Sequence, residues 1–198
     1  YTVQKMLKME RWYDIAMMEI NKTIQIIYNL AFIDGQNLYF RCKEEGWAID
    51  HLKFRTYLRE KYNVIDAFYF LGFISEKEQD LYDSLQKAGF IITFKEHSPA
   101  LKSHKKGNVD SDIIFNIMKK LVDKEELGKI FITSTDGDYK KVVDFLIEKN
   151  CFGKMLFPTK RSASSLYFSL GTEYYDFLDV EDIKAKIAYL HKWKGLLR

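Results

Sequence analysis

Residues 25–37 read QIIYNLAFIDGQN, an apolar run that stops at the dipeptide Asp34-Gly35. A short apolar run that ends at a turn dipeptide is typical of a buried β-strand. Five further segments have the same strand-like character, and they cover residues 64–70, 90–94, 129–133, 154–157 and 174–178.

Helical patterns separate these strands. Asp50 precedes one helix, and further helices are expected at residues 76–88, 139–149 and 164–170 and around Ile113–Val122. Strands that alternate with helices indicate βαβ units with right-handed crossovers. The sequence therefore predicts an α/β fold: a three-layer α/β/α sandwich around a central, mostly parallel sheet.

Helices are also expected at both ends of the chain. Residues 1–22 carry an apolar stripe at steps of three and four, and residues 179–197 read as a closing helix. We therefore predict a helical extension at residues 1–24, one α/β domain at 25–180 and a C-terminal helix at 181–198. The terminal helices could pair two copies into a homodimer, or they could pack on their own domain.

Composition narrows the class of protein. Hydrophobic residues make up 47% of the chain and charged residues 30%, which is ordinary for a globular protein. Cys42 and Cys151 have no metal-binding spacing, which argues against a zinc site and favours a reducing compartment. No apolar run approaches the ~20 residues that a membrane-spanning helix needs, and no signal peptide is recognisable in residues 1–10. A cytoplasmic protein without a membrane partner is expected.

Aspartates follow three of the predicted strands. Asp34 ends the first strand, Asp110 and Asp112 follow the third strand and its basic loop, and Asp136 and Asp138 follow the fourth. Open parallel sheets bind ligands beyond the carboxyl ends of their strands. We therefore expect these carboxylates to meet at one edge of the sheet.

Gathered carboxylates repel one another and call for a counter-ion. Oxygen ligands without suitably spaced His or Cys favour Mg²⁺ or Mn²⁺, ions that promote phosphodiester cleavage. Each aspartate also has a simpler interpretation, because Asp34 could belong only to a turn, Asp110 and Asp138 could only cap helices, and Asp112 could only favour a helix N-terminus. Their joint placement favours a site.

Three blocks of sequence carry a family resemblance. FIDGQNLYF at residues 32–40, KKGNVDSDIIFNIMKKL at 105–121 and FITSTDGDYKKVVDFL at 131–146 resemble, in this order, the signature blocks of NYN domains. NYN domains are PIN-like nucleases that include LabA-like proteins. The resemblance extends over roughly residues 25–180 and implies a PIN-like fold. It also implies hydrolysis of RNA, or less often DNA, by a metal-activated water that leaves a 5′-phosphate.

The resemblance also implies roles for particular residues. Asp34, Asp110, Asp136 and Asp138 would be the catalytic, metal-binding carboxylates. Asn37 would orient Asp34 or a metal-bound water, or would only cap a helix. Ser134 would support the attacking water, fix its loop, or be an ordinary turn residue.

Two positions depart from the family pattern. Asn116 stands where many members have an aspartate, and Asp112, one turn earlier on the same helix, could partly replace it. Tyr139 stands where members usually have phenylalanine. The loss of a charge at Asn116 favours an alternative function, a nucleic-acid-binding NYN module with little or no catalysis.

Basic residues near the acidic edge could contact the phosphates of RNA or DNA, or could simply be solvated. They are Lys102, Lys105, Lys106, Lys140, Lys160 and Arg161. A phosphatase of the dehalogenase-like fold is disfavoured because Gln36 occupies the position of the second aspartate in its DxDG motif. No glycine-rich phosphate loop supports a nucleotide-binding protein.

Overall fold

The computed structural model describes residues 28–95, 109–123 and 127–189. Within them, six strands form one sheet in the order β3-β2-β1-β4-β5-β6, and every neighbouring pair is parallel. The strands are β1 (Tyr28–Asp34), β2 (Val64–Leu71), β3 (Ile91–Phe94), β4 (Leu127–Thr133), β5 (Phe152–Phe157) and β6 (Tyr175–Phe177).

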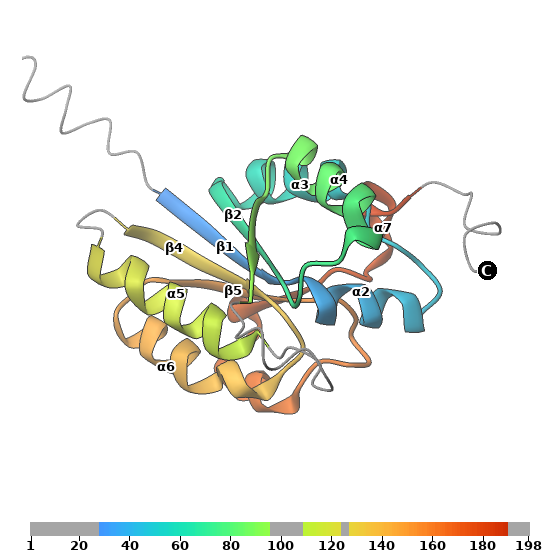
Figure 1. Ribbon diagram of the computed structural model, residues 1–198. Helices are drawn as coiled ribbons and strands as arrows, with labels where there is room; N and C mark the ends of the chain where they lie inside the picture. Colours follow the sequence, from blue (N-terminus) through green and yellow to red (C-terminus); the bar gives the residue numbers. More distant parts are fainter. Residues whose placement is uncertain (1–27, 96–108, 124–126, 190–198) are drawn as a thin grey trace, which may run out of the picture.

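Helices cover both faces of the sheet (Figure 1), so the predicted three-layer α/β/α class is confirmed. The helices α3, α4 and α7 lie on one side, and α5 and α6 lie on the other. The α-helices are α2 (Gly35–Glu44), α3 (His51–Tyr62), α4 (Gln79–Ala88), α5 (Asp110–Asp123), α6 (Lys140–Glu148) and α7 (Glu181–Ile187). Short 3₁₀ helices are η1 (Glu76–Glu78), η3 (Gly137–Tyr139), η4 (Ser165–Leu170) and η5 (Thr172–Tyr174).

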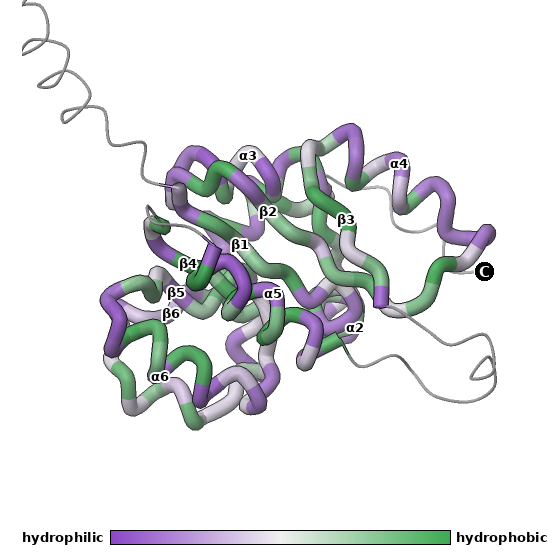
Figure 2. Tube along the Cα trace, turned by 60° about the vertical axis from the view of Figure 1, so that its left-hand side comes forward, coloured by the Kyte–Doolittle hydropathy of each residue, from purple (hydrophilic) through white to green (hydrophobic). Residues whose placement is uncertain are grey.

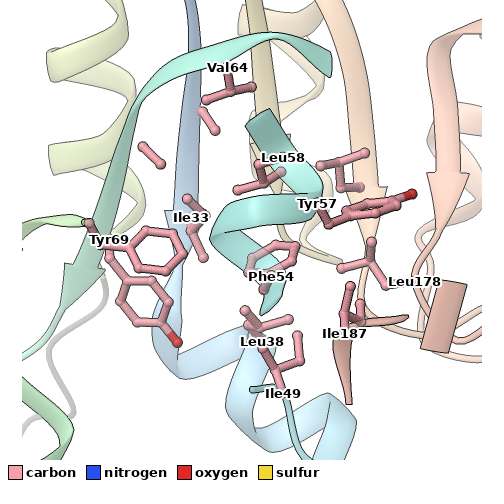
Figure 3. Packing of buried hydrophobic residues seen from close by; sticks show 14 of the residues in the cluster. Ile33, Leu38, Ile49, Phe54, Tyr57, Leu58, Val64, Tyr69, Leu178 and Ile187 are labelled. Atoms are coloured by element: carbon pink, nitrogen blue, oxygen red, sulfur yellow. The ribbon is translucent and has the colours of Figure 1, made fainter. Parts of the chain in front are cut away.

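The central strands bury both of their faces. In β1, Leu30 and Phe32 pack into the layer of α5 and α6, whereas Ala31 and Ile33 pack into the opposite layer, and all four are fully buried. Figure 2 shows the corresponding apolar colour along the middle strands, and Figure 3 shows Ile33 among side chains of the α3 layer. Strands buried on both faces read as continuous apolar runs, which is why residues 28–33 stand out in the sequence.

Local capping fixes where two helices begin. The side chain of Asp34 accepts a hydrogen bond from the Asn37 backbone amide (2.9 Å) at the start of α2, and the side chain of Asp50 accepts one from the Lys53 backbone amide (3.1 Å) at the start of α3. Asn63 ends α3 in the left-handed region, with φ of 52°. Caps of this kind satisfy backbone groups that the helix itself leaves without partners.

Two elements differ from the expectations. The helix α2 was not predicted as a separate element, because only Gly35, Leu38 and Cys42 of its residues are buried, which leaves a weak periodic signal. The closing helix ends at Ile187, earlier than expected, because Ala188 forms an antiparallel bridge with Ile49. This bridge ties the end of α7 to the segment before α3.

Several expectations concern residues outside the described ranges. They include the helical extension at 1–24, the basic loop with Lys102, Lys105 and Lys106, and residues 190–198 of the C-terminal helix, so the suggested dimerisation through the terminal helices is not tested. Among the described helices, none has both the length and the apolar character needed to cross a membrane. Cys42 and Cys151 are both free thiols.

Candidate metal centre

The site lies where the direction of the chain crossovers reverses. The strands β1 and β4 are neighbours in the sheet, with Ile33 beside Thr133. After β1 the chain enters α2, whose Leu38 packs in the layer of α3, whereas after β4 it enters α6, whose Val143 packs in the opposite layer. Helices that leave adjacent strands toward opposite faces open a crevice at the carboxyl ends of those strands.

Carboxylates gather in this crevice. Oxygen atoms of Asp110, Asp136 and Asp138 all lie within 4.8 Å of one another. Asp34 joins Asp110 and Asp136 in the wall of a cleft of about 400 Å³. The residues that line this cleft are Asp34, Gln36, Asn37, Phe40, Arg41, Glu44, Val109, Asp110 and Asp136. The structure thus brings together the four carboxylates that the resemblance implies.

Asp34 is the carboxylate most strongly affected by its surroundings. It is only 7% exposed, and this burial raises its pKa from 3.8 to about 6. The hydrogen bond from the Asn37 amide acts in the opposite direction, and the negative charges of Asp110 and Asp136 raise the pKa further. Ionisation of Asp34 is therefore unfavourable here, because burial and two neighbouring carboxylates oppose its negative charge.

A tyrosine holds Asp110 in place. Asp110 is the first residue of α5 and is 8% exposed, and its Oδ1 accepts a hydrogen bond of 2.5 Å from the hydroxyl of Tyr139. The Tyr139 side chain is fully buried, and desolvation raises its pKa above the ordinary value. The phenol therefore remains protonated and serves as a fixed donor to the carboxylate.

Asp136 sits in a tightly bonded turn. Its side chain accepts a hydrogen bond from the Asp138 amide (3.0 Å), and its own amide donates to the Ser134 hydroxyl (3.2 Å). The backbone carbonyl of Asp136 accepts a hydrogen bond of 2.7 Å from the hydroxyl of Tyr167, which is a fully buried residue of η4. Ser134 is fully buried, and its hydroxyl holds this turn by accepting the hydrogen bond from the Asp136 amide.

Asn37 connects the two loops of the crevice. Its Nδ2 donates to Thr135 Oγ1 (3.0 Å), and its Oδ1 accepts from the Thr135 amide (3.1 Å). The Asn37 side chain thus bonds to the turn after β4, while its backbone amide bonds to Asp34. This pair of bonds, which we call the Asn37–Thr135 clamp, sets the spacing between Asp34 and Asp136.

Asp112 and Asn116 occupy α5 outside the described lining of the cleft. The side-chain amide of Asn116 donates a hydrogen bond of 2.8 Å to the backbone carbonyl of Asp112 on the same helix. The buried Oδ2 of Asp112 accepts no hydrogen bond from the described residues. Asn116 therefore bonds to the helix backbone and not to the carboxylate cluster.

The predicted phosphate-binding residues that the structure describes lie outside the cleft lining. Lys140 forms an ion pair with Asp144 on α6. The Lys160 amide donates to Asp179 (2.9 Å), and the exposed Arg161 lies 3.6 Å from the carboxylate of Glu45, just beyond α2. Within the described cleft lining, Arg41 is the one basic residue, and it forms a 3.0 Å ion pair with Glu44.

Sequence reasoning missed three side chains that shape the site. Thr135 and Tyr139 stand beside the predicted aspartates, but their hydrogen bonds to Asn37 and Asp110 were not predicted. Tyr167 comes from a segment read only as a short helix. The presence of a hydroxyl where relatives have phenylalanine was the available signal for Tyr139, whereas nothing local marks Tyr167.

The donor set fits a divalent metal ion. Carboxylate oxygens from Asp110, Asp136 and Asp138 converge, and Asp34 adds a further buried acid nearby. Hard oxygen donors of this kind suit Mg²⁺ or Mn²⁺. A bound cation would offset the negative charge of the converging carboxylates.

Comparison with known proteins identifies the family. The NYN domain model matches residues 30–170. The Low amplitude and bright protein LabA of Synechococcus elongatus is 23% identical over 127 residues, which cover 60% of this chain and 67% of LabA. The crystal structure of a protein of unknown function from Vibrio parahaemolyticus has a TM-score of 0.67 and 17% identity, and the match covers 82% of this chain and 96% of that chain. That likeness shows the fold alone, whereas the family match contains all four carboxylates. The chain therefore belongs to the NYN domain family, within the PIN-like nuclease superfamily.

Proposed function

We propose that this protein is a divalent-metal-dependent nuclease that hydrolyses phosphodiester bonds of RNA, with DNA as the alternative substrate. The observation that supports this function best is the convergence of Asp110, Asp136 and Asp138 beside buried Asp34. Asp34 ends β1, Asp110 begins α5, and Asp136 and Asp138 follow β4. Asp34, Asp110 and Asp136 line one cleft. A structural role alone does not require carboxylates from separate loops to converge, because like charges repel and burial increases that cost.

Asp110, Asp136 and Asp138 would hold the ion, with Asp34 completing the acidic wall. When bound, Mg²⁺ or Mn²⁺ orients phosphate oxygens, favours ionisation of water and offsets the charge that develops in phosphodiester cleavage. The carboxylate character of all four residues matches both ions. We expect activity with either metal and none in EDTA.

The protein's own contribution is to hold the carboxylates in place. The Tyr139 hydroxyl orients Asp110, and the Ser134 and Tyr167 hydroxyls fix the backbone of Asp136. The Asn37–Thr135 clamp keeps the loops after β1 and β4 in register. Ligands fixed in advance lose less conformational freedom when the ion and the substrate bind.

The test is a cleavage assay on 5′-labelled single-stranded RNA with Mn²⁺, Mg²⁺ or EDTA, with single-stranded DNA in parallel. The variants are Asp34→Asn and Asp136→Asn. Asp83→Asn is the matched control, because Asp83 lies on α4 outside the described cleft lining. Mn²⁺ binding is measured separately, by the loss of the free-ion signal in electron paramagnetic resonance.

We expect metal-dependent cleavage by the wild type and by Asp83→Asn, and its loss in both site variants together with weaker Mn²⁺ binding. Cleavage that persists in the site variants would contradict this assignment. Mn²⁺ and RNA binding without cleavage by the wild type would instead identify a binding module, and Asn116→Asp would then be the first substitution to test for restored activity.

A further inference from the structure

One face of α2 forms a wall of the cleft. Gly35, Leu38 and Cys42 are the buried residues of this helix. The opposite face carries polar and aromatic side chains at steps of three and four residues, the spacing that aligns side chains along a helix. The α2 residues that line the cleft are Gln36, Asn37, Phe40, Arg41 and Glu44.

Phe40 is the aromatic residue of this wall. Its side chain is 42% exposed, and it lines the same cleft as Asp34, Asp110 and Asp136. Exposure alone carries no function, because single exposed apolar side chains are common. The Phe40 ring meets the Tyr39 ring edge to face, with 5.4 Å between the centroids, and remains partly exposed. Its position is informative, because a phenyl ring offers neither a metal ligand nor a hydrogen bond, and here it presents apolar surface beside a site suited to a phosphate.

We propose that Phe40 is a stacking subsite that takes one unpaired nucleobase next to the phosphate held at the carboxylates. This inference rests on the proposed nuclease function and adds a residue that selects the form of the substrate. Bases of single strands stack on aromatic side chains, because every base has a π-face. Bases inside a duplex are already stacked and paired, so the subsite favours single-stranded over double-stranded substrate.

Two arginines lie along α2 and at its end. Arg41 lines the cleft one residue after Phe40, and Arg161 lies 3.6 Å from Glu45, just past the end of the helix. The Arg161 side chain is 87% exposed. A strand whose base stacks on Phe40 would extend its backbone along α2, where both guanidinium groups can contact phosphates.

The experiment measures binding of the full chain to fluorescein-labelled short oligoadenylate by anisotropy with Mn²⁺ in the cold, and a gel checks that the probe stays intact. The variants are Phe40→Ala and Phe40→Trp. Phe115→Ala is the matched control, since Phe115 is an exposed phenylalanine of α5 outside the described cleft lining. A second probe series replaces one nucleotide at a time by an abasic residue, and a duplex RNA completes the set.

Phe40→Ala should raise the Kd for oligoadenylate about tenfold, because stacking on one aromatic ring contributes on that scale. Phe40→Trp and Phe115→Ala should bind like the wild type. One abasic position should weaken wild-type binding by a similar factor and leave Phe40→Ala unaffected. Binding of the duplex should not depend on Phe40.

Three outcomes would overturn the subsite. If Phe40→Ala binds oligoadenylate as tightly as the wild type while the wild type still cleaves RNA, the subsite is absent and the nuclease function stands. If every abasic position weakens Phe40→Ala as much as the wild type, Phe40 contacts no particular base. If the wild type binds and cleaves no nucleic acid with any ion, the subsite and the proposed function both fall.

Discussion

Asp34→Asn should stabilise the metal-free protein at neutral pH while it weakens metal binding. Burial raises the pKa of Asp34 from 3.8 to about 6, so ionising this group in the folded protein is unfavourable. Asparagine has nearly the same shape but carries no charge. Its side-chain oxygen can still accept the hydrogen bond from the Asn37 amide at the start of α2, because asparagine caps helices as well as aspartate does.

The size of the effect follows from the two pKa values. Each pKa unit corresponds to about 1.36 kcal/mol, so the rise of about two units destabilises the folded state by about 3 kcal/mol once Asp34 is fully ionised. For a chain of this length, that energy corresponds to a change in Tm of about 6–12 °C.

The sign of the pH dependence is fixed by the direction of the shift. The folded-state pKa of Asp34, about 6, lies above the value of 3.8 for the unfolded chain. Asp34 is protonated in both states below about pH 3.8, so the penalty is absent there. It grows as the pH rises toward 6 and is complete above that value. The advantage of Asp34→Asn over the wild type should therefore be about 3 kcal/mol at neutral pH and vanish below about pH 4.

Urea unfolding in EDTA at a series of pH values measures this difference, with Asp83→Asn as the control for a generic Asp-to-Asn change. Adding Mn²⁺ should stabilise the wild type more than Asp34→Asn, because at a given concentration a ligand that binds the folded state more tightly stabilises it more. The reasoning is refuted if Asp34→Asn is less stable than the wild type at neutral pH in EDTA, or if the difference between them does not change with pH.

Three further substitutions test the site and its support. Tyr139→Phe removes the donor to Asp110 and should weaken Mn²⁺ binding about 10–100-fold in a paramagnetic resonance titration; unchanged affinity would show that the hydroxyl does not orient the ligand. Gly153→Ala would place a Cβ 2.6 Å from the Phe131 ring, so it should destabilise the fold by about 1–3 kcal/mol in urea, and an unchanged midpoint would contradict this packing. Phe54→Ala removes a fully buried ring and should cost about 3–5 kcal/mol, yet the folded variant should bind Mn²⁺ normally; loss of binding would mean that the α3 layer shapes the site.

The sequence predicts the sheet well because its central strands are buried on both faces. Residues 28–33 form the mostly apolar run that is typical of a strand buried on both faces. An aspartate that directly follows such a strand lies at its carboxyl end, which is where parallel sheets bind ligands. The three blocks that resemble NYN domains also indicate which aspartates belong to the site. The sequence alone therefore predicts that Asp34 lies beside Asp110 and Asp136.

The contacts that hold the site are harder to predict, because they join residues far apart in the chain. Tyr139 and Asp110 are 29 positions apart, and Asn37 and Thr135 are 98 apart. Neither periodicity nor turn chemistry reports which distant hydroxyl faces which carboxylate. The helix α2 escaped prediction for a different reason, since its cleft-facing side replaces apolar residues with the polar and aromatic side chains of the wall.

The Asn37–Thr135 clamp has a consequence for how this protein can change over time. It uses both ends of one side-chain amide, so replacing either residue leaves the other without its partner. A substitution at one of the two positions would then favour a compensating substitution at the other. Across relatives we expect the residues aligned with Asn37 and Thr135 to covary, even though each belongs to a different half of the sheet.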